Sequence, residues 1–362
     1  MAPTCTLIDD GFGPDGAVPV QATTVVSGLE VPWGIAFLPN GDILVTERPG
    51  RIRLVRNGAL VSQPVAVLSD SNTDEGGLLG IALHPDFETN RLFFLYRTVH
   101  ASGGSPLNRV ERWQLSTDGL SATQERILIE DIPASTYHNG GRLRIGPDGL
   151  LYIGTGDSEA PSQSQNLNSP AGKILRVNLD GSVPQDNPVA GNPVYIRGLR
   201  NTQGFDWPDP ANASLMWVTD HGPSGEFGRS DHDEVNVARA GDNLGWPDIF
   251  GCETEDGLVS PAVSWSTATP PGGAAVYTGS DIPEWQGSLL IGTLGSRHLQ
   301  RVEIDSDGKL VSNEVYFQGE FGRLRDVQMG PDGHLYVTTS NCDGRGFCPA
   351  DGDRILRVER DD

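Results

Sequence analysis

Short runs of apolar residues, alternating with polar ones, follow a proline-containing turn at six places in the chain. Two examples are "LPNGDILVTE", which begins at Leu38, and "GPDGLLYIGTGD", which begins at Gly146. Proline and the Asn-Gly or Asp-Gly pair supply the dihedral angles of a tight turn, and the alternation that follows is typical of a strand. The other four copies begin at His84, Trp207, Ile282 and Gly330.

Further strand-like runs, such as "GRIRLVRNG" and "GKILRVNLDG", lie between these copies. Several strands per repeat, with repeats about 45 to 75 residues apart, are typical of a β-propeller. The pattern predicts an all-β protein, a six-bladed β-propeller of antiparallel four-stranded sheets, in one domain over residues 1–362. We expect the final "DRILRVERDD" to pair with "ATTVVSG" near the N-terminus and close the ring. Two β-sandwiches joined by a linker are the alternative, but no linker-like segment divides the chain.

The repeats are unequally spaced, which predicts long loop insertions between blades near residues 184–199 and 243–273. Insertions in a propeller extend the loops of one face, and long loops there commonly build a binding site. We therefore expect these two segments to line a wide cleft.

The composition is acidic, with 26 Lys and Arg against 48 Asp and Glu and a formal net charge of −22. Such a charge repels nucleic-acid backbones and anionic membrane surfaces, so we expect no nucleic-acid partner. The sequence contains no run of 18 apolar residues, and we therefore expect no membrane span.

Four cysteines indicate an oxidising compartment, because their spacing fits no C-x-x-C zinc or redox motif. Cys342 and Cys348 flank a short loop, which leaves Cys5 to pair with Cys252. Reduced, buried thiols are the alternative. The start "MAPTCTLIDDGFG" lacks a signal-peptide pattern and is typical of a mature chain behind an added Met. We expect a periplasmic or secreted protein.

The segment "STYHNGGRLRIGPDGLLYIGTGDS" places His138 before one predicted hairpin and Asp157 after it. Packing of the hairpin requires neither residue. If the two ends meet, the carboxylate could orient a neutral imidazole that removes a proton from a hydroxyl group near neutral pH. The alternative is a surface histidine, with an aspartate that serves only its turn.

Two segments supply arginines. In "YIRGLRNTQGFDW", Arg200 offers a planar set of donors for a carboxylate or quinone oxygen, beside Asn201. In "FGRLRDVQMGPDG", Arg323 and Arg325 alternate on one strand and therefore point to one side. Two cations on one face favour either an anionic ligand or a carboxylate from a neighbouring blade.

An acidic, turn-rich loop runs from residue 219 to residue 236. Hard cations such as Ca²⁺ favour carboxylate and backbone carbonyl oxygens from loops of this kind, although the loop lacks the EF-hand spacing. A solvated acidic loop is the alternative. Its acidic residues are Asp220, Glu226, Asp231, Asp233 and Glu234.

Taken in order, these segments resemble the soluble PQQ-dependent glucose dehydrogenase and aldose sugar dehydrogenase family over nearly the whole chain. The resemblance is carried by "GLEVPWGIAFLPNGDILVTERPGRIRLV", "EGGLLGIALHPDF", "HNGGRLRIGPDGLLYIGTGD", "GLRNTQGFDW" and "GRLRDVQMGPDG". It implies a six-bladed propeller that holds PQQ and Ca²⁺ over its axis and oxidises the C1 hydroxyl of an aldose to the lactone. It also implies an external electron acceptor, such as a dye, quinone or cytochrome, and a monomer or homodimer.

The resemblance assigns roles to individual residues. His138 matches the general base, Asp157 the carboxylate beside it, and Arg200 the cation that stabilises charge on the quinone oxygen. The residues that match cofactor contacts are Asn201, Thr267, Arg323 and Arg325.

The implied calcium ligands lie in the acidic loop. Gly222 and Pro223 match backbone carbonyl donors to the Ca²⁺ that bridges protein and cofactor. Asp220 and Glu234 match ligands of a second, structural calcium, whose remaining ligands would come from positions held here by Tyr137 and Leu244.

The chain departs from the glucose-specific branch of the family at the expected cofactor site. Glu75 and His221 stand where that branch has glutamine, which is closer to the aldose branch. Gly295 stands where the family has a PQQ-contacting lysine, and Arg297 could substitute for it.

Two other functions fit a six-bladed propeller. A calcium-dependent lactonase would need Ca²⁺ and no quinone, which leaves the paired arginines without a purpose. A non-catalytic carbohydrate-binding propeller would explain the fold but not a meeting of His138, Asp157 and Arg200.

Overall fold

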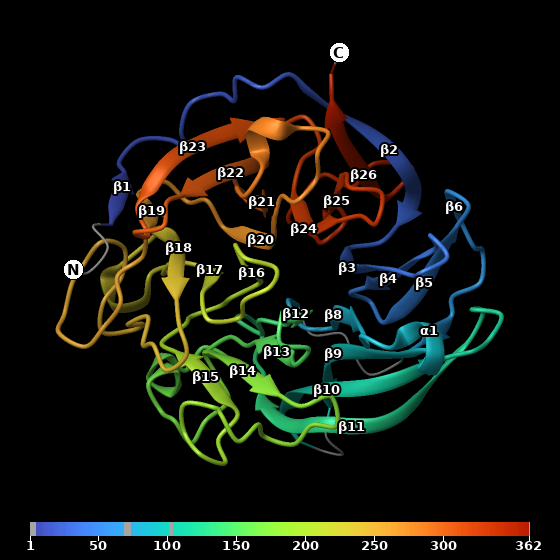
Figure 1. Ribbon diagram of the computed structural model, residues 1–362, viewed down its shortest axis with the longest axis horizontal. Coiled ribbons are helices and arrows are strands. Elements are labelled where there is room, and N and C mark those ends of the chain that lie inside the picture. Colours follow the sequence, from blue (N-terminus) through green and yellow to red (C-terminus); the bar gives the residue numbers. More distant parts are fainter. Residues whose placement is uncertain (1–4, 69–73, 101–103, 362) are drawn as a thin grey trace.

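Six small antiparallel sheets surround a common centre in the computed structural model, which describes residues 5–68, 74–100 and 104–361 (Figure 1). The innermost strands of neighbouring sheets contact one another, for example β3 and β8 or β20 and β24. The protein is thus a six-bladed β-propeller, as the repeated turn and strand pattern predicts.

From the centre outward, the first blade consists of β3 (Pro32–Phe37), β4 (Ile43–Glu47), β5 (Arg51–Arg56) and β6 (Ala59–Leu60), and β7 (Ala66–Val67) also pairs with β5. The second blade consists of β8 (Leu78–Leu83), β9 (Leu92–His100), β10 (Pro106–Leu115) and β11 (Ala122–Pro133). The third blade consists of β12 (Leu143–Ile145), β13 (Leu151–Gly154), β14 (Lys173–Val177) and β15 (Val194–Arg197).

The fourth blade consists of β16 (Gly204–Asp206), β17 (Met216–Asp220), β18 (Asp233–Ala238), β19 (Val263–Trp265) and β1 (Thr6–Ile8). The fifth blade consists of β20 (Pro271–Val276), β21 (Leu289–Thr293), β22 (Leu299–Ile304) and β23 (Leu310–Tyr316). The sixth blade consists of β24 (Leu324–Met329), β25 (Leu335–Thr339), β26 (Asp353–Arg360) and β2 (Val20–Leu29). The helical turns are α1 (Phe87–Asn90), η1 (Pro161–Ser164), η2 (Glu226–Gly228) and η3 (Pro283–Trp285).

The six proline-containing turns occupy equivalent places in the fold. Each joins the innermost strand of a blade to its second strand, for example β12 to β13 through "GPDG". The second strand is the apolar run that follows the turn. One local signal therefore marks every blade, which is why the fold could be read from the sequence.

Chain ends close the ring as expected. Strand β2 pairs antiparallel with β26, from Val20 opposite Arg360 to Leu29 opposite Asp353. Strand β1 adds in parallel to β19, and the Cys5–Cys252 disulfide ties this strand to the same blade. The second predicted disulfide, Cys342–Cys348, is also present.

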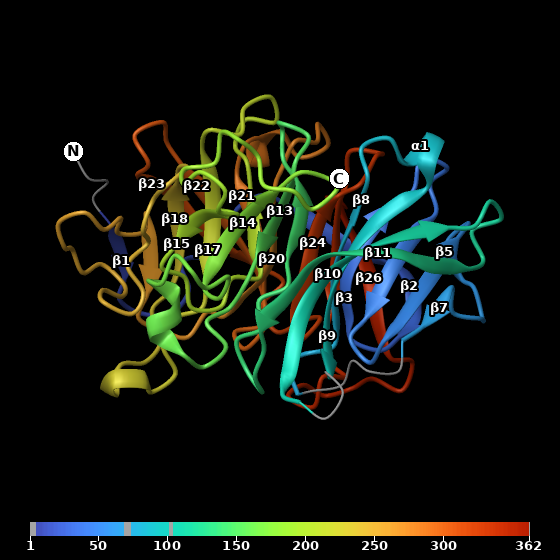
Figure 2. The same ribbon diagram turned by 90° about the horizontal axis from the view of Figure 1, so that it is seen from below.

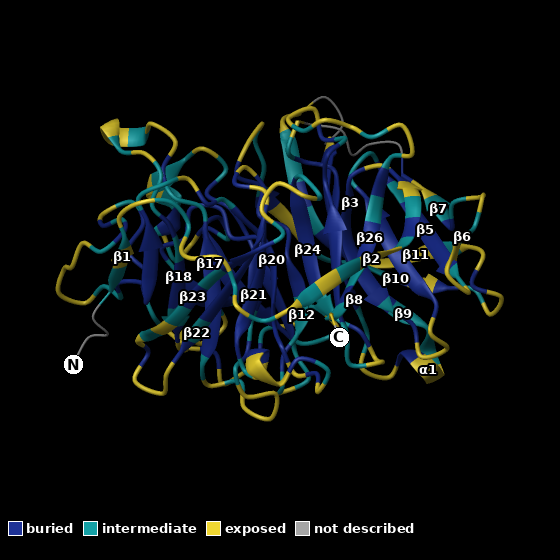
Figure 3. Ribbon diagram, turned by 90° about the horizontal axis from the view of Figure 1, so that it is seen from above, coloured by how far each residue is buried: buried dark blue, intermediate teal, exposed yellow. Residues whose placement is uncertain are grey.

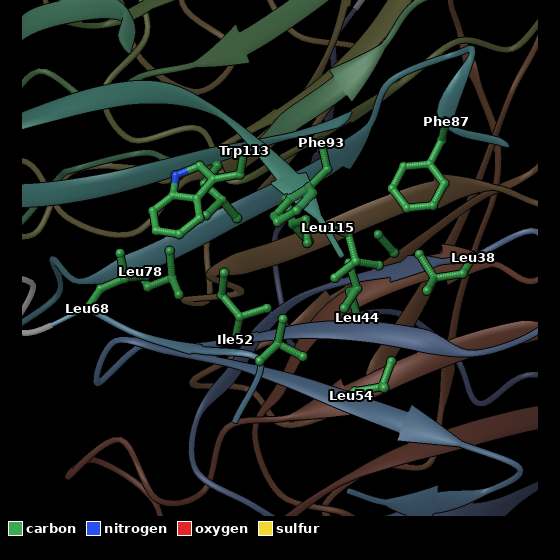
Figure 4. Packing of buried hydrophobic residues seen from close by; sticks show 14 residues of the cluster. Leu38, Leu44, Ile52, Leu54, Leu68, Leu78, Phe87, Phe93, Trp113 and Leu115 are labelled. Atoms are coloured by element: carbon green, nitrogen blue, oxygen red, sulfur yellow. The ribbon is translucent and has the colours of Figure 1, made fainter. Parts of the chain in front are cut away.

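The hydrophobic core lies between the blades. Each of six apolar clusters joins residues of neighbouring blades. In one cluster Leu44 and Ile52 of the first blade pack on Phe93 and Trp113 of the second (Figure 4). The inner strands are accordingly buried, and the exposed residues gather in the loops and on outer strands such as β2 and β11 (Figure 3). Burial of apolar surface between blades holds the ring together.

Both predicted insertions differ from expectation. Residues 184–199 lie within one blade, between β14 and β15, and end in the buried strand β15. Residues 243–273 include strand β19 and the start of β20. The alternation of apolar residues in "NPVYIRG" and "PAVSWST" reflects this strand structure, so these segments are only partly loop.

Among the described residues, none of the helices has the length and apolar character needed to span a bilayer.

Candidate active site

A cavity of about 600 Å³ opens at the centre of one face of the propeller. All six blades line it, through residues before or at the start of an innermost strand or after a second strand. These two positions meet at one edge of each sheet because the two strands are antiparallel. The turn η2 projects from this face (Figure 2, lower left, yellow).

His138 lines this cavity and meets the buried Asp157, although the hairpin β12–β13 separates the two residues in sequence. His138 Nδ1 lies 2.8 Å from Asp157 Oδ1, and Trp246 Nε1 donates to Asp157 Oδ2 at 2.9 Å. The carboxylate is buried and receives the Nδ1 proton, so Nε2 is left as the basic nitrogen toward the cavity. Gly156 is required here, because a Cβ would lie 1.9 Å from the carbonyl oxygen of His138.

Arg200 is linked to His138 through Glu226. Its Nη2 and Nε both donate to Glu226 Oε1, at 2.6 and 3.1 Å. The same oxygen is 3.9 Å from His138 Nε2. Asn201 Oδ1 accepts from the backbone N–H of Gly140 at 3.0 Å, which joins the Arg200 loop to the His138 loop.

A cluster of arginines lines the other side of the cavity. Arg323 Nε donates to Asp343 Oδ2 at 2.8 Å, and Arg325 Nε donates to Ser340 Oγ at 2.9 Å. Burial lowers the pKa of Arg325 to about 9 and also lowers that of Arg48. Removing these cations from water disfavours their charge, so the cavity attracts an anion.

Glu75 and His221 also line the cavity. Burial raises the pKa of Glu75, but the charge and hydrogen bond of Arg345, whose Nη1 lies 2.6 Å from Glu75 Oε1, outweigh it together with His221 and the backbone N–H of His138, and the net pKa is lowered. Glu75 Oε2 accepts from the backbone N–H of His138 at 3.1 Å. Burial lowers the pKa of His221 to about 3, so its imidazole is neutral, and Nε2 donates to the carbonyl of Pro271 at 2.6 Å.

Two predicted cofactor contacts lie outside the cavity. Thr267 Oγ1 accepts from the backbone N–H of Gly11, because the loop between β19 and β20 packs on the N-terminal segment. Arg297 lines a separate pocket with Phe321. Gly295 does line the cavity. Of the two predicted insertions, only Pro270 is among the lining residues in the described chain, so they do not form the cleft expected of them.

Several residues that line the cavity were not predicted from the sequence, namely Arg48, Gln203, Asp343 and Arg345. Glu226 was predicted only as part of the acidic loop, and it also lines the cavity. Arg48 follows β4 just as Asp157 follows β13. The position after the second strand of each blade was therefore a usable signal.

The residues expected to bind calcium are only partly brought together. Asp220 lies opposite Glu234 in the register of β17 and β18, and burial raises their pKa values to about 7 and about 8. However, Asp220 accepts the backbone N–H groups of Arg200 and Asn201, at 2.7 and 2.8 Å. Within residues 5–68, 74–100 and 104–361, no group of three or more His, Cys, Asp or Glu side chains could hold a metal ion.

The other predicted positions around the second calcium point elsewhere. Tyr137 lines the cavity, with the Arg345 guanidinium 5.4 Å from its ring centroid, and Leu244 is buried in the core between two blades. Gly222 and Pro223 form the turn after β17, beside the lining residue Ser224.

Comparison with known proteins identifies sugar dehydrogenases that match this chain over most of its length. The aldose sugar dehydrogenase YliI of Escherichia coli (strain K12) is 31% identical over 90% of this chain and 91% of its own length. A PQQ-bound aldose sugar dehydrogenase from Streptomyces coelicolor has a TM-score of 0.84 and 34% identity, covering 96% of this chain and 100% of its own. A putative oxidoreductase (glucose dehydrogenase) from Thermus thermophilus has a TM-score of 0.84 and 41% identity, covering 94% and 99%.

A sequence model of the Glucose / Sorbosone dehydrogenase family matches residues 29–355, which include the innermost strands of all six blades and the residues that line the cavity. The protein with this arginine-lined cavity and His138–Asp157 pair belongs to the glucose/sorbosone dehydrogenase family.

Proposed function

We propose that this protein oxidises the C1 hydroxyl of aldose sugars to the lactone with PQQ as cofactor and passes the electrons to an external acceptor. Its relatives support an oxidoreductase that acts on CH–OH groups of sugars. The observation that carries the finer proposal is the meeting of the His138–Asp157 pair with Arg200 in a cavity lined by further arginines.

The cavity suits a flat, polyanionic quinone. Arg323, Arg325 and Arg48 would hold its carboxylates, and the ring of Trp33 offers a flat apolar wall. When bound there, PQQ would supply the quinone that accepts the hydride from C1 of the sugar. Asn201, whose side chain also supports the His138 loop, would be a further contact.

His138 is the proposed base. Its Nε2 would accept the proton of the C1 hydroxyl, while Asp157 holds the Nδ1 proton and stabilises the imidazolium that forms. Trp246 keeps the carboxylate of Asp157 in place from behind. This arrangement would assist the transfer of hydride from the sugar, because removal of the hydroxyl proton makes C1 a better hydride donor.

Arg200 would stabilise negative charge that develops opposite His138. It would have to share or lose its present contact with Glu226, because both Nε and Nη2 are directed at that carboxylate. Glu75 would border the sugar rather than repel the cofactor, since Arg345 neutralises its charge.

Calcium is part of the proposal on donor chemistry alone. Two successive carbonyl groups, of Gly222 and Pro223, lie in the turn beside the cavity, and a hard cation favours such oxygens. Ca²⁺ held there would act as a Lewis acid.

We further propose a periplasmic or secreted location, because both disulfides favour an oxidising compartment.

Dye reduction tests the proposal. Purified protein, with PQQ and Ca²⁺ added, should reduce a soluble redox dye with glucose, xylose or another aldose and form the lactone. Matched samples without PQQ should be inactive, and samples with EDTA should lose activity if the calcium assignment holds. No reduction with any aldose in the fully supplemented sample would contradict the proposal, and lactone hydrolysis with Ca²⁺ alone would favour the lactonase alternative.

A further inference from the structure

The disulfide-closed loop from Cys342 to Cys348 follows β25, on the cavity face of the sixth blade. Two of its residues, Asp343 and Arg345, line the cavity. We infer that this loop is the element that arranges the arginine cluster, and that Asp343 is a positioning residue for Arg323 and Arg325. The inference rests on the proposed PQQ function and concerns how the cofactor site is built.

Asp343 is the shared partner of three arginines. Its Oδ2 accepts from Arg323 Nε at 2.8 Å and lies 3.8 Å from Arg325 Nη2. Its backbone carbonyl accepts from Arg48 Nη2 at 3.2 Å. The side chain is 1% exposed, so these contacts are made away from water and are worth more than a surface ion pair.

Without Asp343, Arg323 and Arg325 would repel each other. Both side chains line the cavity, both are buried, and both guanidinium groups reach the same oxygen, Asp343 Oδ2. A carboxylate between them gives each guanidinium one defined direction, so a ligand need not restrict flexible side chains when it binds. Asp343 therefore prepares the site even though its charge has the same sign as the proposed ligand.

The loop also reaches the proposed base. Arg345 Nη1 donates to Glu75 Oε1 at 2.6 Å, and Glu75 Oε2 accepts from the backbone N–H of His138 at 3.1 Å. Asp343 Oδ1 accepts from the backbone N–H of Arg345 at 2.9 Å. One loop thus contacts the arginine cluster on one side and the support of His138 on the other.

Local geometry explains why the loop must be closed. Its disulfide spans 6 residues and restricts the conformations of the chain between the cysteines. Gly346 passes so close to Arg323 that a Cβ would lie 2.9 Å from Arg323 Cδ. Opening the disulfide would free Asp343 from this packing.

The test measures PQQ binding in the absence of sugar, by quenching of tryptophan fluorescence in the wild type, Asp343→Ala and Asp343→Asn. Removing the carboxylate adds one unit of positive charge to the cavity. If Asp343 did no more than reduce the positive charge of the cavity, both variants would bind PQQ more tightly. The positioning role predicts the opposite, a dissociation constant raised about tenfold or more by alanine. Asparagine should be less harmful, because its Oδ1 can still accept from Arg323 Nε.

Two controls complete the experiment. Asp351→Asn removes a nearby but exposed carboxylate that pairs with Arg354, and it should leave PQQ affinity unchanged. The double variant Cys342→Ser/Cys348→Ser should weaken binding as Asp343→Ala does, and it keeps the inference testable if Asp343→Ala fails to fold. Wild-type affinity, or tighter binding, in folded Asp343 variants would overturn the inference alone. Failure of the wild type to bind PQQ would overturn the proposed function, and this inference with it.

Discussion

At the scale of single residues, the site depends on which hydrogen bonds each side chain already makes. Asp157 uses one oxygen for His138 and the other for Trp246. The carboxylate is therefore fixed from two directions, and the basic nitrogen of His138 is directed by a buried partner rather than by solvent. That difference separates a proposed base from an ordinary loop histidine.

Replacing His138 with alanine should abolish most turnover while PQQ still binds. General-base catalysis contributes roughly 10²- to 10⁴-fold to a rate, and His138 is not part of the arginine cluster. Dye reduction at saturating sugar measures the first effect, and fluorescence titration with PQQ measures the second. Turnover at the wild-type rate would remove His138 from its assigned role.

The pair Asp157→Asn and Trp246→Phe should separate the two contacts of the carboxylate. Asparagine cannot stabilise an imidazolium and can favour the wrong tautomer, so kcat should fall strongly. Phenylalanine removes the indole donor to Asp157 Oδ2 but keeps an aromatic ring beside Arg200, and kcat should fall less. A larger loss for Trp246→Phe than for Asp157→Asn would refute this order.

At the scale of elements, each blade presents two short segments to the same face. The turn signal within each blade made the propeller predictable, and the segment around β12 and β13 placed His138 and Asp157 correctly at its two ends. Arg48 and Arg345 follow the second strands of their blades, a position that points to the cavity face, but their contacts there arise only when six loops converge. Thr267 and Arg297 lie outside the cavity, because motif similarity does not fix where a loop residue points.

Lys173 at the start of β14 anchors the loop that follows Asp157. Its Nζ donates to the carbonyl groups of Gln163, Ser164 and Ala171, at 2.7, 2.9 and 2.6 Å. Lys173→Met should remove all three hydrogen bonds of the buried ammonium and leave the carbonyl of Ala171 without its donor, which should lower the free energy of unfolding by roughly 2 to 4 kcal/mol.

Chemical denaturation of Lys173→Met checks this value. The exposed Lys309 provides the matched control, and Lys309→Met should change stability by no more than about 0.5 kcal/mol. Equal stability of the two variants would mean that the Lys173 contacts do not hold the loop.

At the scale of the whole molecule, the chain ends complete the ring. Strands β2 and β26 form one blade together, and β1 extends another, with a disulfide across a sequence separation of 247 residues. The N-terminal segment therefore contributes to the fold at two places, on the outer edges of blades rather than in the cavity wall.

Removing the Cys5–Cys252 disulfide by the double variant Cys5→Ser/Cys252→Ser should lower the free energy of unfolding by about 2 to 5 kcal/mol. The cross-link closes a very long loop, so its loss frees the unfolded chain. PQQ affinity should stay unchanged, because neither cysteine lines the cavity. A loss of PQQ affinity without a loss of stability would contradict the claim that this disulfide stabilises the propeller and does not shape the cavity.

The central claim is that sugar oxidation occurs at bound PQQ in this cavity, and a single-turnover experiment tests it most directly. Protein loaded with one equivalent of PQQ and Ca²⁺ is mixed with an aldose without any electron acceptor, and the cofactor absorbance and the lactone are measured together. The account predicts reduction of the bound cofactor with one lactone formed per PQQ, and a far slower reaction in His138→Ala. Bound PQQ that stays oxidised with every aldose tested would contradict it.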